Sequence, residues 1–109
     1  MSLTITAGEI AVQDPSDIRV YDFDWGEDNL PTGVEITGSA TWTITAVDPS
    51  SATLMTKDQE SIVTGNRKAR VRLQGGTNGA RYNIACKVTT NETPAQTKEQ
   101  SFDILVQHR

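Results

Sequence analysis

The sequence predicts an all-β fold, an immunoglobulin-like β-sandwich of about seven antiparallel strands. Three observations support this. Apolar residues recur at every second position in several segments, which is the period of a strand with one buried face. Turn-forming residues separate these segments at short spacing, and no segment shows an amphipathic helical pattern of useful length. With 109 residues, the chain has the size of one domain.

The clearest pair of strands flanks a glycine-rich corner at residues 73–82, LQGGTNGARY. The corner supplies three glycines that adopt positive φ without steric cost, so the chain can reverse between strands at 68–74 and 80–90. Tyr82 stands where immunoglobulin-like folds place a tyrosine that hydrogen-bonds back across such a corner. Trp42 fits the core tryptophan position on an earlier strand, with no disulfide to pack against.

The other elements follow from the same period and from turn residues. Residues 1–13 are expected to form an N-terminal arm or first strand, and residues 14–109 a single immunoglobulin-like domain. Three aromatic side chains share one face of the segment 18–25 and indicate a core. The stretch 48–66 is polar and is interpreted as a long connection with local pairing at 53–55 and 61–64. The remaining strands are expected at 34–37, 40–47 and 97–107.

Enzyme chemistry is disfavoured by the residues that the sequence lacks. Cys86 is the only cysteine and shares a strand face with Ile84 and Val88, so we expect a buried small hydrophobe. The only histidine, His108, is next to last in the chain, which leaves no Ser-His-Asp or Cys-His set. Zinc spacing is missing, and the glycine-rich corner lacks the Lys-Ser/Thr ending of a P-loop. We expect no catalytic residues and no cofactor.

The net charge of −4 hides a division along the chain. Residues 1–60 hold eleven Asp and Glu against Arg19 and Lys57, whereas residues 61–109 hold eight Lys and Arg against three Asp and Glu. Such asymmetry suggests charge complementarity, either within one copy or between subunits. The candidate interface residues are four acidic and four basic side chains: Asp22, Asp24, Glu27, Asp28, Arg67, Lys68, Arg70 and Arg72.

Each half of this candidate interface has alternative interpretations. The acidic cluster offers oxygen ligands at close spacing, as calcium sites do, but it does not match an EF-hand loop, so a solvated edge is the default and no metal is expected. The basic strip at 67–72 raises the possibility of nucleic acid, which the acidic net charge and the lack of exposed interleaved aromatics oppose. A protein partner, a neighbouring subunit or an ordinary charged face remain open.

Export and membrane insertion are not expected. The first residues lack the basic start and apolar run of a signal peptide, and no stretch approaches the ~18 uninterrupted apolar residues of a membrane span. The triplet Asn91-Glu-Thr93 matches an N-glycosylation acceptor, but without a secretory signal it is interpreted as a plain turn.

An ordered set of short motifs across residues 14–106 resembles a family of small tailed-phage virion proteins described as fiber-tail adaptors. Single motifs are weak, but their order and spacing are specific. The motifs are Asp14-Pro15, Tyr21-x-x-Asp24-Trp25, Leu30, Gly33, Ile36, Ser39, Thr41-Trp42-Thr43, Leu73-x-Gly75-Gly76-Thr77-x-Gly79-x-x-Tyr82, Val88-Thr89-Thr90 and Phe102-x-Ile104-x-Val106.

The resemblance implies an immunoglobulin-like, non-enzymatic structural component of a bacteriophage particle, located in the virion after assembly in the host cytoplasm. Its expected partners are other virion proteins of the tail, fiber or capsid, with several copies or a homo-oligomeric ring, and neither nucleic acid nor membrane. The alternatives are a capsid decoration protein of the same fold and a carbohydrate- or receptor-binding module. The segments 48–66 and 91–96 depart from the family pattern and are candidates for partner contact.

The charge division and this resemblance together suggest one specific contact. A head-to-tail interface closes a ring when an acidic patch on one copy meets a basic patch on the next. We therefore expect the acidic region 22–28 of one subunit to contact the basic strip 67–72 of its neighbour.

Overall fold

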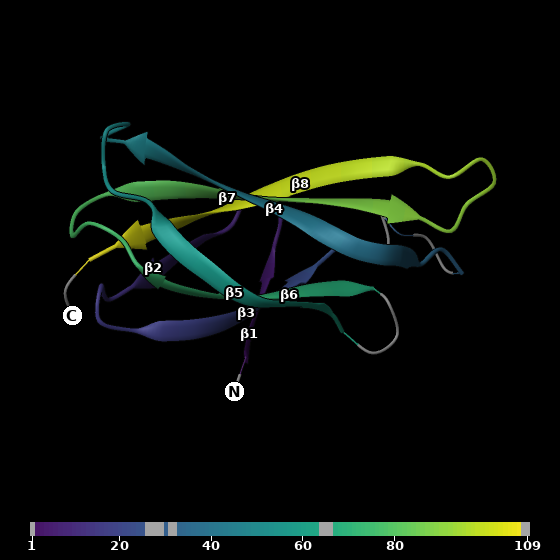
Figure 1. Ribbon diagram of the computed structural model, residues 1–109, viewed down its shortest axis with the longest axis horizontal. Coiled ribbons are helices and arrows are strands. Elements are labelled where there is room, and N and C mark those ends of the chain that lie inside the picture. The colour runs from purple at the N-terminus through teal and green to yellow at the C-terminus, as the bar shows by residue number, and fades with distance from the viewer. Residues whose placement is uncertain (1, 26–29, 31–32, 64–66, 108–109) are drawn as a thin grey trace.

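A computed structural model describes residues 2–25, 30, 33–63 and 67–107 of the chain. Two four-stranded sheets pack face to face in an elongated body that measures 44 × 28 × 21 Å (Figure 1). The all-β sandwich predicted from the alternating pattern is confirmed. The strands are β1 (Ser2–Thr6), β2 (Ile10–Gln13), β3 (Ile18–Asp24), β4 (Ile36–Asp48), β5 (Met55–Ile62), β6 (Lys68–Gly75), β7 (Arg81–Thr90) and β8 (Thr97–Val106).

The first sheet has the order β1-β3-β6-β5 and the second the order β2-β8-β7-β4. Four of the described strand pairs are antiparallel, as expected, but β1 runs parallel to β3 and β2 runs parallel to β8. The antiparallel arrangement thus holds for the pairs among β3 to β8, and the two strands within residues 2–13 add parallel pairs to it. Both parallel pairs join strands that are not consecutive in the chain, so no hairpin imposes an antiparallel direction on them.

Residues 2–13 contribute one strand to each sheet. Between β1 and β2, Gly8 adopts a φ of 81° and its N–H donates to the carbonyl of Ser101 at 2.9 Å. A left-handed residue at this point lets the chain leave one sheet and join the other. The N-terminal segment thus spans the open side of the sandwich opposite β4 and β5.

The core lies between the sheets, where the predicted alternating rows meet. Tyr21 and Phe23 of β3 are fully buried, and both rings lie 5.7 Å from the ring of Phe102 on β8. Trp25 meets Phe23 edge to face at 5.2 Å. Ring contacts of this geometry stabilise the fold beyond the contribution from burying the rings. The aromatic core predicted for the segment 18–25 is confirmed.

The glycine-rich corner has the predicted tyrosine contact. The hydroxyl of Tyr82 accepts a hydrogen bond from the N–H of Thr77 at 2.8 Å and donates to the carbonyl of Thr53. The ring therefore joins the corner to the segment that precedes β5. Trp42 lies in the core with 5% of its surface exposed, as expected from its position in the sequence.

Two segments differ from the expectations. The predicted strands at 34–37 and 40–47 form a single strand, β4, interrupted by a bulge between Thr37 and Thr41 at which Gly38 has a φ of 71°. The stretch interpreted as a polar connection contains β5, which is one strand of eight residues instead of two short ones. Its side chains are mostly exposed because it lies at a sheet edge, so no alternation marks it in the sequence.

Candidate interaction surfaces

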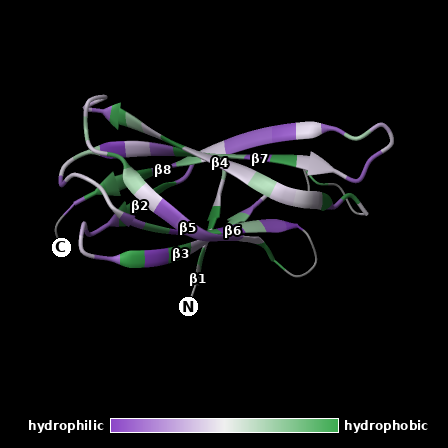
Figure 2. Ribbon diagram, in the orientation of Figure 1, coloured by the Kyte–Doolittle hydropathy of each residue, from purple (hydrophilic) through white to green (hydrophobic). Residues whose placement is uncertain are grey.

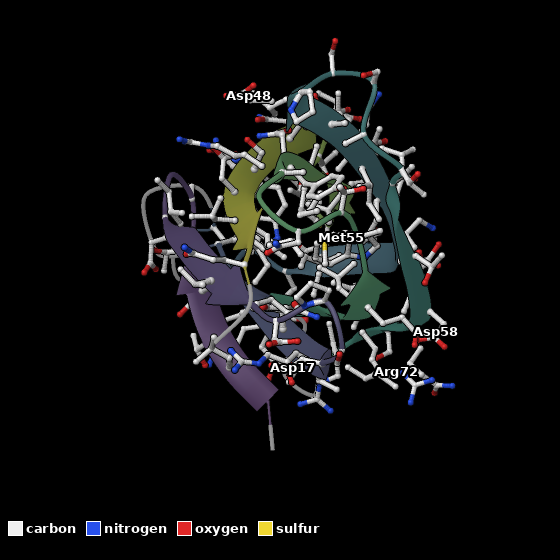
Figure 3. The ribbon with its side chains drawn as sticks, turned by 90° about the vertical axis from the view of Figure 1, so that its left-hand side faces the viewer. Asp17, Asp48, Met55, Asp58 and Arg72 are labelled. Carbon is white, nitrogen blue, oxygen red and sulfur yellow. The ribbon has the colours of Figure 1, made fainter. Side chains whose placement is uncertain are left out.

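The outer face of the β1-β3-β6-β5 sheet carries two ion pairs built from cross-strand neighbours. Asp22 and Arg70 lie opposite each other in the β3–β6 register, and the guanidinium donates to both carboxylate oxygens at 2.7 and 3.0 Å. Arg72 and Asp58 are partners in the β5–β6 register and make the same two-point contact at 2.8 and 2.7 Å. Figure 3 shows Asp58 beside Arg72 on this outer face, and Met55 between the sheets.

These contacts shift the ionisation of the paired groups. Hydrogen bonds from Arg72 hold the pKa of Asp58 below its ordinary value of 3.8. The hydrogen bonds to Asp22 and Asp58, and the charges of these carboxylates, raise the pKa values of Arg70 and Arg72. In each of these three groups the shift favours the charged form, as expected for a hydrogen-bonded ion pair. Charge complementarity, anticipated either within or between subunits, is realised here within one copy.

The other candidate interface residues lie in different surroundings. Lys68 and Asp24 are cross-strand neighbours where β3 ends and β6 begins. Arg67 donates to the backbone carbonyls of Val34 at 2.9 Å and of Leu30, so it holds the segment before β4 against β6. Glu27 and Asp28 lie outside the described residues. The contact between the acidic region of one subunit and the basic strip of the next stays a prediction.

The described residues provide neither a cluster of metal ligands nor a reactive thiol. No cluster of three or more His, Cys, Asp or Glu side chains among these residues could hold a metal ion. Cys86 is buried, as predicted, and burial together with the nearby Glu99 carboxylate raises the pKa of its thiol from 9.0 to about 12. A thiol that stays protonated and buried is a poor nucleophile.

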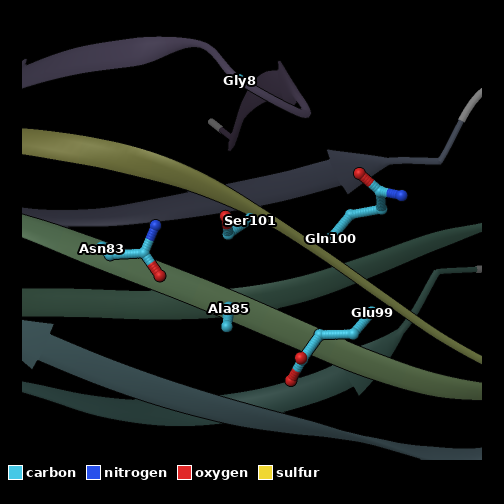
Figure 4. Close-up of a pocket in the computed structure, with 6 residues that line it drawn as sticks. All are labelled: Gly8, Asn83, Ala85, Glu99, Gln100 and Ser101. Atoms are coloured by element: carbon cyan, nitrogen blue, oxygen red, sulfur yellow. The ribbon is translucent and has the colours of Figure 1, made fainter.

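An open hollow of about 420 Å³ lies on the outer face of the other sheet, between β7 and β8 (Figure 4). It arises because Ala85 and Ser101, which are opposite each other in the register, carry small side chains. Beside it, Asn83 donates to the Asp103 carboxylate at 3.0 Å, and Arg81 donates to the same carboxylate at 2.9 Å. Of the residues that line the hollow, Asn83 is thus already engaged with Asp103.

Two loops lie at opposite ends of the sandwich, one before β5 and one between β7 and β8 (Figure 1). In the first, which spans residues 49–54, the N–H of Ala52 donates to the carbonyl of Pro49 at 3.1 Å, and Thr53 accepts from Tyr82. Leu54 in this loop and Val47 just before it expose 47% and 48% of their surface. This end of the molecule thus presents apolar side chains on an anchored backbone.

The second loop, residues 91–96, is organised around Thr90, whose side chain is buried. The Thr90 N–H donates to the carbonyl of Gln96 at 2.8 Å, and the Thr90 hydroxyl donates to Glu92 at 2.9 Å. Asn91 and Glu35 exchange two hydrogen bonds of 2.9 Å, one from each N–H. The turn inferred from Asn91-Glu-Thr93 therefore attaches the loop to the start of β4.

Sequence reasoning missed two polar residues that shape these surfaces. Asp58, the partner of Arg72, lies in the stretch whose polar composition favours a connection. Gln13 is fully buried; its amide donates to the carbonyl of Leu73 at 2.9 Å, and it accepts from the hydroxyl of Tyr21 at 2.8 Å. The only signal for Gln13 is its position before the Asp14-Pro15 break, which does not indicate burial.

The described part of the chain holds no helix long and apolar enough to cross a membrane. Among solved structures, the fold is similar to the cysteine protease inhibitor EhICP2 from Entamoeba histolytica, with a TM-score of 0.52 and 9% identity over 95% of this chain and 93% of that one. At this identity the likeness concerns the fold alone. A comparison with curated protein sequences gave no match.

A family model gives the functional link. The model of the podophage GP4 fiber-tail adaptor protein gp77 matches residues 13–105, which include β3 to β7 and nearly all of β8. The match thus covers three strands of each sheet, the glycine-rich corner and both end loops. The chain therefore belongs to the podophage GP4 fiber-tail adaptor (gp77) family of phage virion proteins.

Proposed function

We propose that this protein is a non-enzymatic adaptor that connects a fiber to the tail of a podophage particle. The family match over residues 13–105 carries this proposal. An adaptor must hold two partners at once, so it needs two surfaces that are far enough apart for both to bind. The partners are other virion proteins, several copies act together, and assembly takes place in the host cytoplasm.

The elongated sandwich supports this role through its two anchored loops. The loop 49–54, with Val47 and Leu54, and the loop 91–96 lie at opposite ends of a body 44 Å long. Both backbones are fixed by hydrogen bonds to neighbouring strands, so little ordering is required when a partner binds. We assign one end to the tail and the other to the fiber.

The alternative functions receive less support. A capsid decoration protein of the same fold would need a single attachment face, and the family is one of fiber-tail adaptors. A carbohydrate-binding sandwich would present exposed aromatic rings, whereas both Trp25 and Trp42 are buried.

The proposal is tested with phage particles assembled without this protein. We expect tails that lack fibers and do not infect, and expect fibers to return when the purified protein is added to the particles. Electron microscopy of tagged particles then locates the protein. Normal fiber attachment in its absence, or a label on the head surface, would reject the adaptor role.

A further inference from the structure

We propose that the free edge of β4 pairs antiparallel with the same edge of a second copy, centred on Thr43. The two β2-β8-β7-β4 sheets would then form one continuous sheet across a twofold axis. The inference rests on the four sheet edges and does not depend on the proposed adaptor function.

Three of the four edge strands carry features that oppose pairing with another chain. On β5, Lys57, Asp58 and Glu60 place charges along the edge. The same strand bulges between Asp58 and Ser61, where Gln59 adopts a φ of 54°. Charges and a bulge of this kind interrupt the regular ladder that an added strand requires.

The edges at the N-terminus are short and partly occupied by side chains. In β1, which has five residues, the N–H of Thr6 donates to the carboxylate of Glu9 at 2.7 Å. In β2, which has four residues, the carbonyl of Val12 accepts from the Arg19 guanidinium at 3.4 Å. Neither edge offers a long uninterrupted row of backbone groups.

β4 is different, because it is the longest strand and has no charged residue from 36 to 47. In Figure 2 most of it lacks the strong hydrophilic colour that marks much of β5. Its register with β7 is regular from Thr41 to Ala46, and across the described residues it pairs with no other strand. This segment, TWTITA, is rich in the β-branched and aromatic residues that favour strands.

One inward-facing side chain of β4, that of Ile44, is incompletely covered at the free edge. Ile44 faces inward between Trp42 and Ala46, both of which are buried, yet Ile44 remains partly exposed. A strand placed against β4 would cover it. In the twofold arrangement centred on Thr43, Ile44 of one copy lies opposite Trp42 of the other.

The sequence of the edge favours a second copy as the occupant. A twofold axis places the edge against the same edge of the other copy, so an edge with one sign of charge would repel itself, whereas this edge has no charge from 36 to 47. On the outer face, Thr43 meets Thr43 and Thr41 meets Thr45, which are favourable cross-strand pairs. The bulge at one end and the shift after Ala46 at the other limit the pairing to this short segment.

Sedimentation velocity over a concentration series tests the pairing. We expect the wild-type chain to shift from monomer to dimer, and Thr43→Lys and Thr43→Glu each to remain monomeric, because each places two like charges opposite each other. Mixing the two variants should restore a heterodimer. Thr43 is exposed, so both variants should keep the wild-type Tm at concentrations where the wild type is monomeric. Thr97→Lys, which adds the same charge to an exposed position of β8 in the same sheet, should dimerise as the wild type does.

Several outcomes would overturn the proposal: a wild-type chain that stays monomeric, a mixture of variants that stays monomeric, growth beyond a dimer, or equal loss of association in Thr97→Lys. If the wild type is monomeric and Thr43→Lys is nevertheless lost from particles, the β4 edge belongs to a different virion protein and the twofold pair is wrong.

Discussion

At the residue scale, Gly76 shows how closely the corner approaches the core. A Cβ at this position would lie 3.0 Å from Met55 Cγ and Val106 Cγ2, and 3.3 Å from the ring of Tyr82. The residue also has a φ of 93°. Two separate costs therefore oppose any side chain here, a backbone conformation that favours glycine and a collision with three core residues.

Substitution of two corner glycines separates these costs. Gly79 has a φ of 87°, but a Cβ there would meet nothing within 4 Å, so Gly79→Ala should lower the free energy of unfolding by about 1–2 kcal/mol through backbone strain alone. Gly76→Ala should lose a further ~1–3 kcal/mol through overpacking. Urea unfolding measures both. Equal losses would mean that the packing around Gly76 relaxes freely.

Single residues were predictable where the fold uses them in a recurrent way. Tyr82 and Trp42 occupy positions that a sandwich requires, and the structure has both in the core. Gln13 was not predictable, because its hydrogen bonds to Leu73 and Tyr21 exist only once β2 and β3 lie in opposite sheets. Burial of a polar side chain depends on partners that a linear pattern does not contain.

At the scale of elements, the register between β3 and β6 determines what the charged strip does. Asp22 exposes only 6% of its surface and has Arg70 as its cross-strand partner. Loss of Arg70 would therefore leave a desolvated carboxylate without this partner. The same pairing bears on the ring hypothesis, because substitution of Arg70 alone would affect both the stability of the subunit and any contact between subunits.

A charge exchange separates the two effects. Arg70→Asp should lower the Tm clearly, because two carboxylates then face each other. The double variant Asp22→Arg/Arg70→Asp should recover most of the loss by restoring the pair in the opposite sense. Circular dichroism follows the melting. A double variant whose loss equals the sum of the single variants would show that the pair contributes nothing specific.

The elements with one buried face were predictable, and the edge strands were not. The alternating rows of β3, β6, β7 and β8 gave their positions and inward faces correctly, as with Val71 and Ile104. β5 is almost entirely exposed, so its sequence carries no period. The ion pairs of Arg70 and Arg72 were missed for a related reason. Their partners depend on which strands are neighbours in the sheet, and the alternating pattern of a single strand does not reveal its neighbours.

At the scale of the whole molecule, the long axis separates the two loops that we assign to different partners. Leu54→Ser with Val47→Ser changes exposed side chains at one end, and Thr93→Lys with Ala95→Lys changes the other. Neither pair should alter the Tm much. In pull-down assays with purified tail and fiber proteins, each double variant should lose one partner and keep the other. Loss of the same partner by both variants would contradict a two-ended adaptor.

The parallel pairing of β2 with β8 has a mechanical consequence. The first residue of β2 and the last residue of β8 lie at opposite ends of a shared register, in which Ile10 faces Asp103 and Gln13 faces Val106. Tension applied to the two ends of the chain would slide these strands along each other. The bonds from Asp103 to Glu9 and from Gln107 to Gln13 would then carry the load together in shear, instead of opening one after another as in a hairpin peeled from its end.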